Sequence, residues 1–570
     1  MRYLAFCTDY DGTIALHGRV DDDTIAALER LRESGRKLVM VTGREIPDLQ
    51  TVFSRFDLFD VIVAENGALL YWPDSEEEQV LAEPAPVEFV EALRAKGVER
   101  ISVGRSIVAT WTPHETTVLE TIRELGLGLQ VIFNKGAVMV LPAGVTKATG
   151  LNVALCEINI SPRNAVAVGD AENDHPLFKL CECSAAVANA LPAVKDRADI
   201  VLQTDHGGGV RELIGEMLEN DLANREPKRS RDVLIGSDAE GERVCLSPYS
   251  VNALIVGSSG GGKSSVATGL IERLHENGYN YCIIDPEGDY DNIDSAVVLG
   301  GPDHAPTLDE CEQLLCKPET NAIINLLGVK LEDRPWFFMA FFARLRDIRA
   351  RTGRPHWLLV DEAHHMLPAQ WQATDAPSPD NLDGVVMVSV TPSLIAPAVL
   401  RHIDTILALG EKPAEMLREF TDANGLAPVE SPRDALEPGT AIVWSKSSQG
   451  APRLVQVEPS RTERKRHLRK YAEGSLPEDR SFYFRGPQGK LRLRAPNLTL
   501  FMDLADGVDD ETWLYHLKQH EVSEWLRKGI RDDSIADEVA QIEQQREIDA
   551  NDARRRIREL IEARYTLPAG

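Results

Sequence analysis

The sequence lacks the features that mark secreted, membrane-spanning and nucleic-acid-coating proteins. Its eight cysteines are scattered and form no C-x-x-C pair, so we predict reduced thiols and neither a disulfide framework nor a zinc site. No apolar run is long enough to cross a bilayer, and the opening MRYLAFCTDYDGT has no signal-peptide core. Only 62 lysines and arginines stand against 90 aspartates and glutamates, and this formal net charge of −28 opposes general binding to polyanions. We therefore predict a cytoplasmic protein with no membrane partner.

With 570 residues, of which 43% are hydrophobic, the chain is long enough for about two to four domains. Short β-branched runs alternate with helical patterns in residues 1–222 and again in 233–458, which predicts two α/β domains. The polar stretch NREPKRSRD predicts a linker over residues 223–232. Residues 459–570 open on the basic run RTERKRHLRKY, and their later apolar residues recur at helical spacing among Glu and Arg. This pattern predicts a basic linker and a mainly helical C-terminal module.

Residues 6–16, FCTDYDGTIAL, place two carboxylates at the end of an apolar run. An aspartate at a strand end can accept a phosphoryl group when a second acid protonates the leaving group. We predict Asp9 as this nucleophile and Asp11, turned back by Gly12, as general acid and then general base. Thr42 in VMVTGRE is predicted to hydrogen-bond the phosphate, and Lys147 in GVTKATGL to supply a positive charge beside it.

Two further carboxylates, Asp170 and Asp174 in VAVGDAENDHPLF, follow another apolar run. Carboxylate oxygens are the ligands that Mg²⁺ prefers, and a cation is needed where phosphate and carboxylate oxygens crowd together. The sequence therefore predicts a Mg²⁺ site formed by Asp9, Asp11, Asp170 and Asp174.

These motifs, in this order over about residues 1–220, resemble the haloacid dehalogenase (HAD) superfamily of phosphatases. The resemblance implies a Rossmann-like sheet and an aspartate nucleophile that forms an aspartyl-phosphate. The segment between AENGALLYW (64–72) and Lys147, about residues 70–143, is placed like the α/β cap of the Cof-like members. A closing cap excludes bulky molecules, so we predict that the substrate is a small phosphorylated metabolite. Asn66 in ENGA is either a substrate contact or a turn residue.

A second phosphate-handling motif, GSSGGGKSS, follows the apolar run Ala253–Val256 and precedes a helical pattern. It fits the P-loop pattern G-x-x-x-x-G-K-S, in which backbone N–H groups surround a polyphosphate, the lysine reaches the terminal phosphates and the serine binds Mg²⁺. We predict that Ser264 binds Mg²⁺. The predicted ATP-binding residues are Gly257, Ser258, Ser259, Gly260, Gly261, Gly262, Lys263, Ser264 and Ser265.

In the stretch HWLLVDEAHHML, the carboxylates of Asp361 and Glu362 stand at the end of an apolar run. We predict that Asp361 supports the Mg²⁺ of bound ATP and that Glu362 polarises the attacking water. Together with the P-loop stretch and IIDPEGDY, this segment resembles the HerA/FtsK-like ATPases over about residues 230–458. The resemblance implies a RecA-like fold and ATP hydrolysis. The motors of that class are hexamers, so the resemblance also makes a hexamer possible. Where those motors usually carry a glutamine, VVMVSVTPSLI offers Ser389 and Thr391, so motor action is left open.

Two arginine-rich segments each have two interpretations. The arginines of FFARLRDIRARTGR (341–354) either reach the ATP of a neighbouring subunit or form a solvated helix face, which we favour. Residues 477–530 either stack on single-stranded nucleic acid or form a small helical domain. Acidic residues interrupt any basic surface there, so we favour the helical domain, with Phe501, Trp513, Leu517 and Trp525 as its core.

Three functions fit these motifs. The leading hypothesis is a Mg²⁺-dependent HAD phosphatase joined to an ATP-hydrolysing domain. The second is an enzyme like polynucleotide kinase/phosphatase that acts on nucleic-acid ends, although Glu362 beside Asp361 favours attack by water. The third makes the ATPase part a non-motor sensing or assembly module that regulates the phosphatase. Homo-oligomerisation and binding to nucleic acid stay open.

Overall fold

The computed structural model describes residues 1–570 except 135, 226–227, 229–230, 250, 259–260, 292, 371–381, 448–449, 462–475, 477–479, 531, 546–548 and 566–570. The chain folds into two compact units. The first comprises Met1–Gly288 with Ile293–Arg461, and the second Asp289–Asn292 with Thr462–Gly570.

The first unit begins with a sheet in which eight strands lie among the described residues, in the order β12-β11-β10-β1-β2-β3-β4-β5. Strands β12 to β3 are parallel, and β4 and β5 pair antiparallel because short turns connect them. The strands are β1 (Ala5–Thr8), β2 (Lys37–Val41), β3 (Val61–Ala64), β4 (Leu69–Trp72), β5 (Glu77–Val80), β10 (Ala165–Gly169), β11 (Cys183–Ala186) and β12 (Ile200–Val201).

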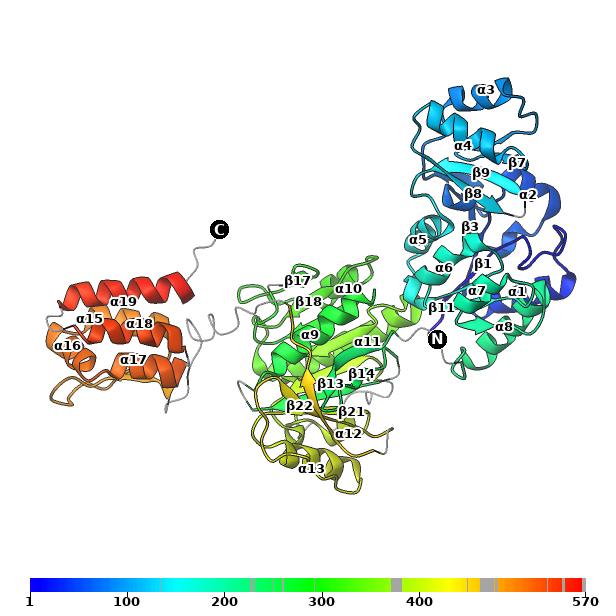
Figure 1. Cartoon of the computed structure of the whole chain (residues 1–570). Helices are drawn as coiled ribbons and strands as arrows, with labels where there is room; N and C mark the ends of the chain where they lie inside the picture. The colour runs from blue at the N-terminus through cyan, green and yellow to red at the C-terminus, as the bar shows by residue number, and fades with distance from the viewer. Residues whose placement is uncertain are drawn as a thin grey trace. The chain divides into compact units, whose positions relative to one another are not determined.

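Helices flank this sheet, and its parallel strands are continuous apolar runs because both of their faces are buried. Helix α1 packs beside α8, and α5 packs beside α6 (Figure 1). The helices are α1 (Asp22–Glu33), α2 (Ile46–Val52), α5 (Lys147–Glu157), α6 (His175–Leu180), α7 (Pro192–Arg197) and α8 (His206–Asn220).

A smaller α/β layer is inserted between β5 and α5. Its antiparallel strands have the order β6-β7-β9-β8, and α3 and α4 pack on them around Phe89, Leu93 and Val118. This inserted cap comprises α3 (Val87–Ala95), β6 (Ser102–Val103), β7 (Val108–Trp111), α4 (Glu115–Glu124), β8 (Leu129–Asn134) and β9 (Ala137–Pro142).

The second sheet of this unit has eleven strands among the described residues, in the order β14-β13-β23-β22-β21-β15-β20-β19-β16-β18-β17. The strands from β21 to β17 are parallel, and β22, β23, β13 and β14 continue the sheet antiparallel. Its strands are β13 (Val233–Asp238), β14 (Arg243–Leu246), β15 (Ala253–Gly257), β16 (Tyr281–Asp285), β17 (Val297–Leu299), β18 (Ala322–Asn325), β19 (Trp357–Val360), β20 (Val385–Ser389), β21 (Thr405–Leu409), β22 (Thr440–Ser445) and β23 (Arg453–Val457).

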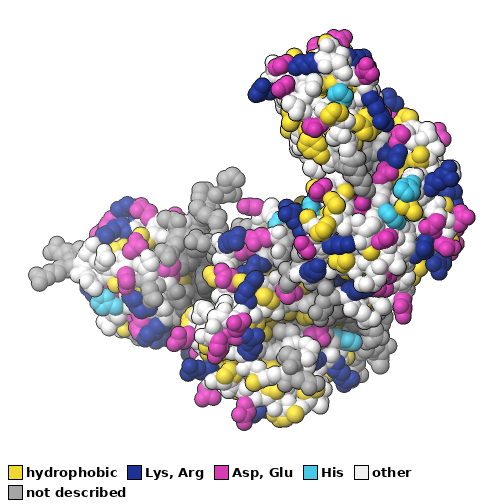
Figure 2. Space-filling view, turned by 45° about the vertical axis from the view of Figure 1, so that its right-hand side comes forward, with side chains coloured by type: hydrophobic (Ala, Val, Ile, Leu, Met, Phe, Trp, Pro, Cys, Tyr) yellow, Lys and Arg dark blue, Asp and Glu magenta, His cyan; other side chains and the backbone are white. Residues whose placement is uncertain are grey.

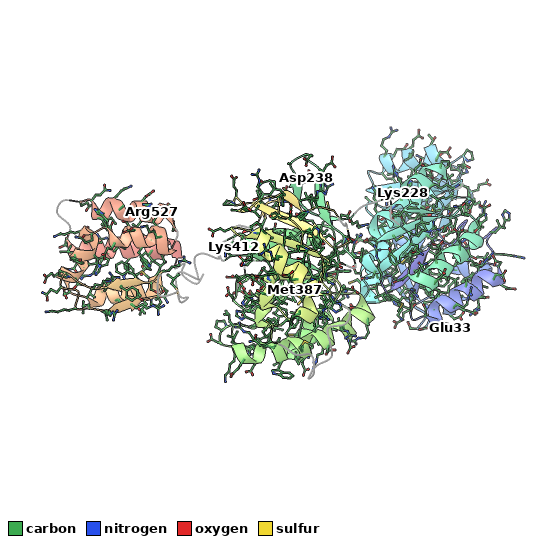
Figure 3. All side chains as sticks on the ribbon, turned by 90° about the horizontal axis from the view of Figure 1, so that it is seen from below. Glu33, Lys228, Asp238, Met387, Lys412 and Arg527 are labelled. Carbon is green, nitrogen blue, oxygen red and sulfur yellow. The ribbon has the colours of Figure 1, made fainter. Side chains whose placement is uncertain are left out.

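Helices cover the second sheet, whose central strands are fully buried. Figure 3 labels Met387 of β20, one of these central strands. The helices are α9 (Lys263–Glu276), α10 (Leu308–Leu315), α11 (Arg334–Thr352), α12 (Pro397–Leu400) and α13 (Pro413–Asn424).

The second unit is mainly helical, and a small hairpin of β24 (Phe482–Phe484) and β25 (Leu493–Ala495) precedes its helices. Phe501, Trp513, Leu517 and Trp525 are buried in one core, as predicted from the sequence. The helices are α15 (Leu498–Gly507), α16 (Asp510–Lys518), α17 (Glu521–Trp525) with its continuation over Leu526–Ile530, α18 (Asp533–Glu543) and α19 (Ala550–Tyr565).

The structure has the predicted α/β class: a Rossmann-like sheet with an inserted α/β cap, a second α/β sheet carrying the P-loop, and a mainly helical C-terminal segment. Within the described part of the chain, no helix combines the length and the apolarity that crossing a membrane requires.

Candidate functional site

The residues of the first predicted site converge at one edge of the first sheet. Asp9 follows β1, Thr42 follows β2 and Asp170 follows β10, and these three strands lie side by side in parallel. Polar residues at the carboxyl ends of adjacent parallel strands share one edge of a sheet. Lys147 joins them as the first residue of α5, which begins at a Thr146 capping box.

Lys147 links two of the predicted carboxylates directly. Its ammonium donates to Asp9 Oδ1 at 2.5 Å and to Asp174 Oδ1 at 2.7 Å, and all three side chains are buried. Asp174 is fixed in turn, because its Oδ2 accepts from the backbone N–H of Asp170 at 2.9 Å. Thr13 donates to Asp170 Oδ1 at 3.2 Å. The cluster is therefore held from several elements at once.

The carboxylates of Asp9, Asp170 and Asp174 suit a divalent cation. One oxygen atom from each lies within 4.8 Å of the others. Burial raises the pKa of Asp9 to about 7, and the negative charges of Asp174 and Asp170 add to this effect while Lys147 opposes it. Three carboxylates around one ammonium leave excess negative charge, and oxygen ligands of this kind fit Mg²⁺. Asp11, predicted as a fourth ligand, has its carboxylate outside this cluster.

Asp11 instead pairs with Arg44. The guanidinium Nε and Nη2 donate to the two carboxylate oxygens at 2.6 and 2.8 Å, which fixes the carboxylate in a bidentate pair. Thr42 is buried and its Oγ1 accepts from Arg44 N at 3.1 Å. Sequence reasoning missed Arg44, although it stands two residues after Thr42 in the same VTGRE motif. A guanidinium so close to a threonine that is predicted to bind phosphate was the available signal.

The second predicted site has the strand, loop and helix order of a P-loop. Strand β15 ends at Gly257 and α9 begins at Lys263, after Gly262 in the left-handed region at φ +88°. The Lys263 ammonium donates to Gly257 O at 2.8 Å and to Ser258 O at 3.3 Å. Ser264 is buried, and its hydroxyl has no hydrogen-bond partner among the described residues. A buried hydroxyl without a hydrogen-bond partner, next to this lysine, is suited to coordinate the predicted Mg²⁺ of a bound ATP.

Four other predicted P-loop residues complete this account. Gly261 donates its N–H to Ser258 O at 3.0 Å. Ser265 is exposed on the first turn of α9. Ser259 and Gly260 lie outside the described residues.

Asp361 and Glu362 follow β19, and β20 lies between β19 and the P-loop strand β15. Asp361 is fully buried, and its Oδ1 accepts from Glu362 N at 3.1 Å. Glu362 lies 3.4 Å from His364 Nδ1, and the same nitrogen lies 3.3 Å from Ser389 Oγ at the end of β20. Burial lowers the pKa of His364 to about 4, so its ring is neutral at pH 7. Ser389 thus joins the group that contains the predicted water-polarising glutamate.

Two of the arginines of α11 illustrate its structural contacts. Arg349 donates to the backbone oxygens of Pro355 and Asp383, both at 2.7 Å, and Arg344 pairs with Asp309. The face of the molecule in Figure 2 mixes basic and acidic side chains. The contacts of Arg344 and Arg349 agree with the favoured interpretation of the helix as a packed and solvated element.

The two sheets of the first unit meet around a buried carboxylate that sequence reasoning missed. Glu182, just before β11, lies 3.3 Å from Arg2, 3.1 Å from Arg163 and 3.3 Å from Arg231. The hydroxyl of Tyr279, just before β16, also donates to it at 3.2 Å. A lone glutamate in the sequence CEC gave no signal that partners from both sheets would surround it.

We expect Glu182→Ala to lower the thermal unfolding midpoint by about 5 °C or more, because removing one partner of a buried ion pair costs about 3–5 kcal/mol. Differential scanning calorimetry measures the effect. Glu219→Ala, at an exposed glutamate of α8, serves as the control and should leave the midpoint unchanged. An unchanged midpoint in both variants would contradict a stabilising role for this cluster.

Comparisons with known proteins match the two sheets separately. Residues 6–103 and 118–214 match the haloacid dehalogenase-like hydrolase family, and residues 238–333 match the central domain of the helicase HerA. Phosphoglycolate phosphatase 2 of Saccharolobus solfataricus is 30% identical over 228 residues, which cover 38% of this chain and 94% of that protein. Phosphoglycolate phosphatase of Methanopyrus kandleri is 30% identical over 223 residues, 37% of this chain and 96% of that protein.

Among solved structures, a haloacid dehalogenase-like hydrolase from Bacteroides thetaiotaomicron is 21% identical. It aligns with a TM-score of 0.33, over 38% of this chain and 99% of that one. The family matches confirm both resemblances that the motifs indicated, and they support a phosphoric monoester hydrolase joined to a P-loop ATPase domain.

Proposed function

The chain belongs to the haloacid dehalogenase-like hydrolases, and from this premise we propose that its first domain is a Mg²⁺-dependent phosphatase of a small phosphorylated metabolite. The observation that carries the proposal is the buried Lys147 ammonium that bridges Asp9 and Asp174 beside Asp170. It provides a nucleophile, a countercharge and a set of hard oxygen ligands in one cluster.

In the proposed reaction, Asp9 attacks phosphorus and forms an aspartyl-phosphate while the substrate oxygen leaves. Asp11 protonates that oxygen and then takes a proton from the water that hydrolyses the acyl phosphate. Thr42 donates a hydrogen bond to the phosphate, and Lys147 balances its charge. Mg²⁺, held by Asp9, Asp170 and Asp174, would neutralise phosphate oxygens when bound. Arg44 holds the Asp11 carboxylate in place between these two proton transfers.

The substrate class follows from the cap and from the relatives. The cap is inserted beside the catalytic edge, which favours a small molecule over a phosphoprotein or a nucleic-acid end. Since the matched relatives are phosphoglycolate phosphatases, a phosphorylated small hydroxy acid is the first substrate to test.

For the second domain we propose ATP binding and hydrolysis, with the phosphates on residues 257–265 and with Glu362 polarising the attacking water. The orphaned hydroxyl of Ser264 supports a Mg²⁺·ATP complex at this loop. The cluster around Glu182 joins the two sheets, which favours the regulatory hypothesis, in which nucleotide state influences the phosphatase, over two unconnected activities. A hexamer and binding to nucleic acid remain hypotheses to be tested by ring formation and by stimulation of ATP hydrolysis.

The proposal is tested by measuring phosphate release from phosphoglycolate, sugar phosphates and nucleotides, each with MgCl₂ or with EDTA. We expect release from at least one small non-nucleotide ester. Chelation should lower this release about 10²–10³-fold, because a bound cation contributes several kcal/mol of transition-state stabilisation. Restoring excess MgCl₂ is the control for irreversible damage. Undiminished hydrolysis in EDTA, or no release from any ester, would contradict the proposed phosphatase.

A further inference from the structure

One buried carboxylate of the first domain is not used by the proposed reaction. Glu65 follows β3 and is 1% exposed. Its Oε1 accepts from Arg105 N at 2.8 Å, and its Oε2 accepts from Ser106 N at 2.8 Å and Ile107 N at 2.9 Å. The three donors are consecutive backbone amides in the turn between β6 and β7 of the cap. A carboxylate held by several backbone N–H groups is fixed in both position and direction.

The backbone beside Glu65 is tied just as closely to the catalytic edge. Glu65 N donates to Arg44 O at 3.0 Å, and Asn66 N donates to Thr42 O at 3.0 Å. A Cβ atom on Gly67 would lie 2.0 Å from Thr146 O, so this loop passes directly against the start of the helix that carries Lys147. The loop of residues 65–67 therefore contacts the segments that carry Thr42, Arg44 and Lys147.

The conformation of this loop is costly and is maintained by its contacts. Glu65 and Asn66 have φ values of +52° and +55°, in the left-handed region that side chains other than glycine seldom adopt. Two such residues in succession are strained and persist only where the surroundings fix them. Here the left-handed turn is what directs the Glu65 side chain into the cap while its backbone stays on the core.

Other contacts between cap and core differ in kind. Ser102 of β6 donates to the Glu45 carboxylate, and Asn66 contacts Met139 of β9. Arg105 also pairs with Glu78 at 2.8 Å, but the arginine side chain of that pair is 63% exposed. Exposed pairs of this kind contribute little. Glu65 supplies a buried and fully hydrogen-bonded connection, in direct contact with the loop that holds Thr42.

We propose that Glu65 is a positioning residue that sets the cap turn of residues 104–107 over the phosphatase site and thereby determines substrate selection. The inference rests on the proposed phosphatase function. Its carboxylate touches neither the substrate nor the nucleophile. It acts by fixing where the cap side chains stand relative to Asp9, Asp11 and Thr42.

The test compares Glu65→Gln with wild type in kcat and KM for phosphoglycolate, or for the best small ester found, and for 4-nitrophenyl phosphate. A glutamine side chain has nearly the same shape but only one acceptor oxygen, so at least one cap amide would face an NH₂ group. We expect kcat/KM for the small ester to fall about tenfold or more, mainly through KM, because a displaced cap loses its contacts. The 4-nitrophenyl ester, which depends less on cap contacts, should change less than about twofold.

Two further variants keep the test decisive. Gly104→Ala leaves the charge of Glu65 intact, but its new Cβ would lie 2.5 Å from Glu65 Oε1, so it should shift specificity in the same way. Glu78→Gln removes the negative charge of the exposed pair with Arg105 and should leave turnover of both substrates unchanged. Equal losses on both substrates, or an unchanged ratio in Glu65→Gln and Gly104→Ala, would overturn the positioning role. Inactivity of the wild type on every ester would instead contradict the proposed function.

Discussion

Asp9→Asn is expected to abolish phosphate release from the small ester, by roughly 10⁴-fold or more, and to leave ATP hydrolysis within about twofold of wild type. The amide cannot attack phosphorus, and it also removes one of the three negative charges that suit a cation. Steady-state phosphate release with each substrate measures both activities. Because burial raises the pKa of Asp9 to about 7, its ionised form is costly to bury, so the amide should not lower the thermal unfolding midpoint.

Asp74→Asn is the matched control, since it makes the same chemical change at an exposed residue between β4 and β5. It should retain both activities. If Asp9→Asn kept measurable turnover of the small ester, another residue would be the nucleophile. If it removed ATP hydrolysis as well, the two sites could not act independently.

The candidate catalytic edge was predictable because its polar residues lie in short motifs at strand ends. Asp9, Thr42, Asp170 and Asp174 each follow a continuous apolar run or closely adjoin one, and parallel strands bring such residues to one edge. The same reasoning located the P-loop, since a strand, a glycine-rich loop and a helix are contiguous in sequence. These predictions needed only local patterns and the resemblance they carry.

Contacts between segments far apart in sequence were not predictable in the same way. Glu65 meets the amides of residues 105–107 only because the cap folds back onto β3, and Glu182 gains partners from residues 2 to 279. A glutamate in a loop ordinarily indicates solvent exposure. The burial of these two depends on tertiary packing that hydrophobic periodicity does not encode. The bidentate pair of Arg44 with Asp11 also depends on tertiary packing, because the two residues come from different segments of the chain. A local motif at the end of an apolar run indicated Asp11 but not its partner.

Lys263→Ala is expected to lower ATP hydrolysis by about 10²-fold or more, because we propose that its ammonium reaches the terminal phosphates and contributes to both binding and charge stabilisation. In the structure this ammonium donates to Gly257 O and Ser258 O, at the start of α9. Phosphate release from the small ester should stay within about twofold of wild type when no nucleotide is present. Assays of both activities with and without ATP separate the outcomes.

Lys412→Ala is the matched control on the same domain. Lys412 is an exposed lysine just before α13, labelled in Figure 3, and it pairs with Glu415 in the first turn of that helix. It should leave ATP hydrolysis unchanged, and full ATP hydrolysis in Lys263→Ala would contradict the P-loop assignment.

The effect of ATP on the small-ester reaction decides between the remaining hypotheses. If ATP changes phosphatase turnover in wild type but not in Lys263→Ala, nucleotide state acts through the contacts around Glu182, and Glu182→Ala should remove the same response. If label passes from ATP to a 5′-hydroxyl end, the second domain is a kinase, and Glu362 does not serve a water-activating role.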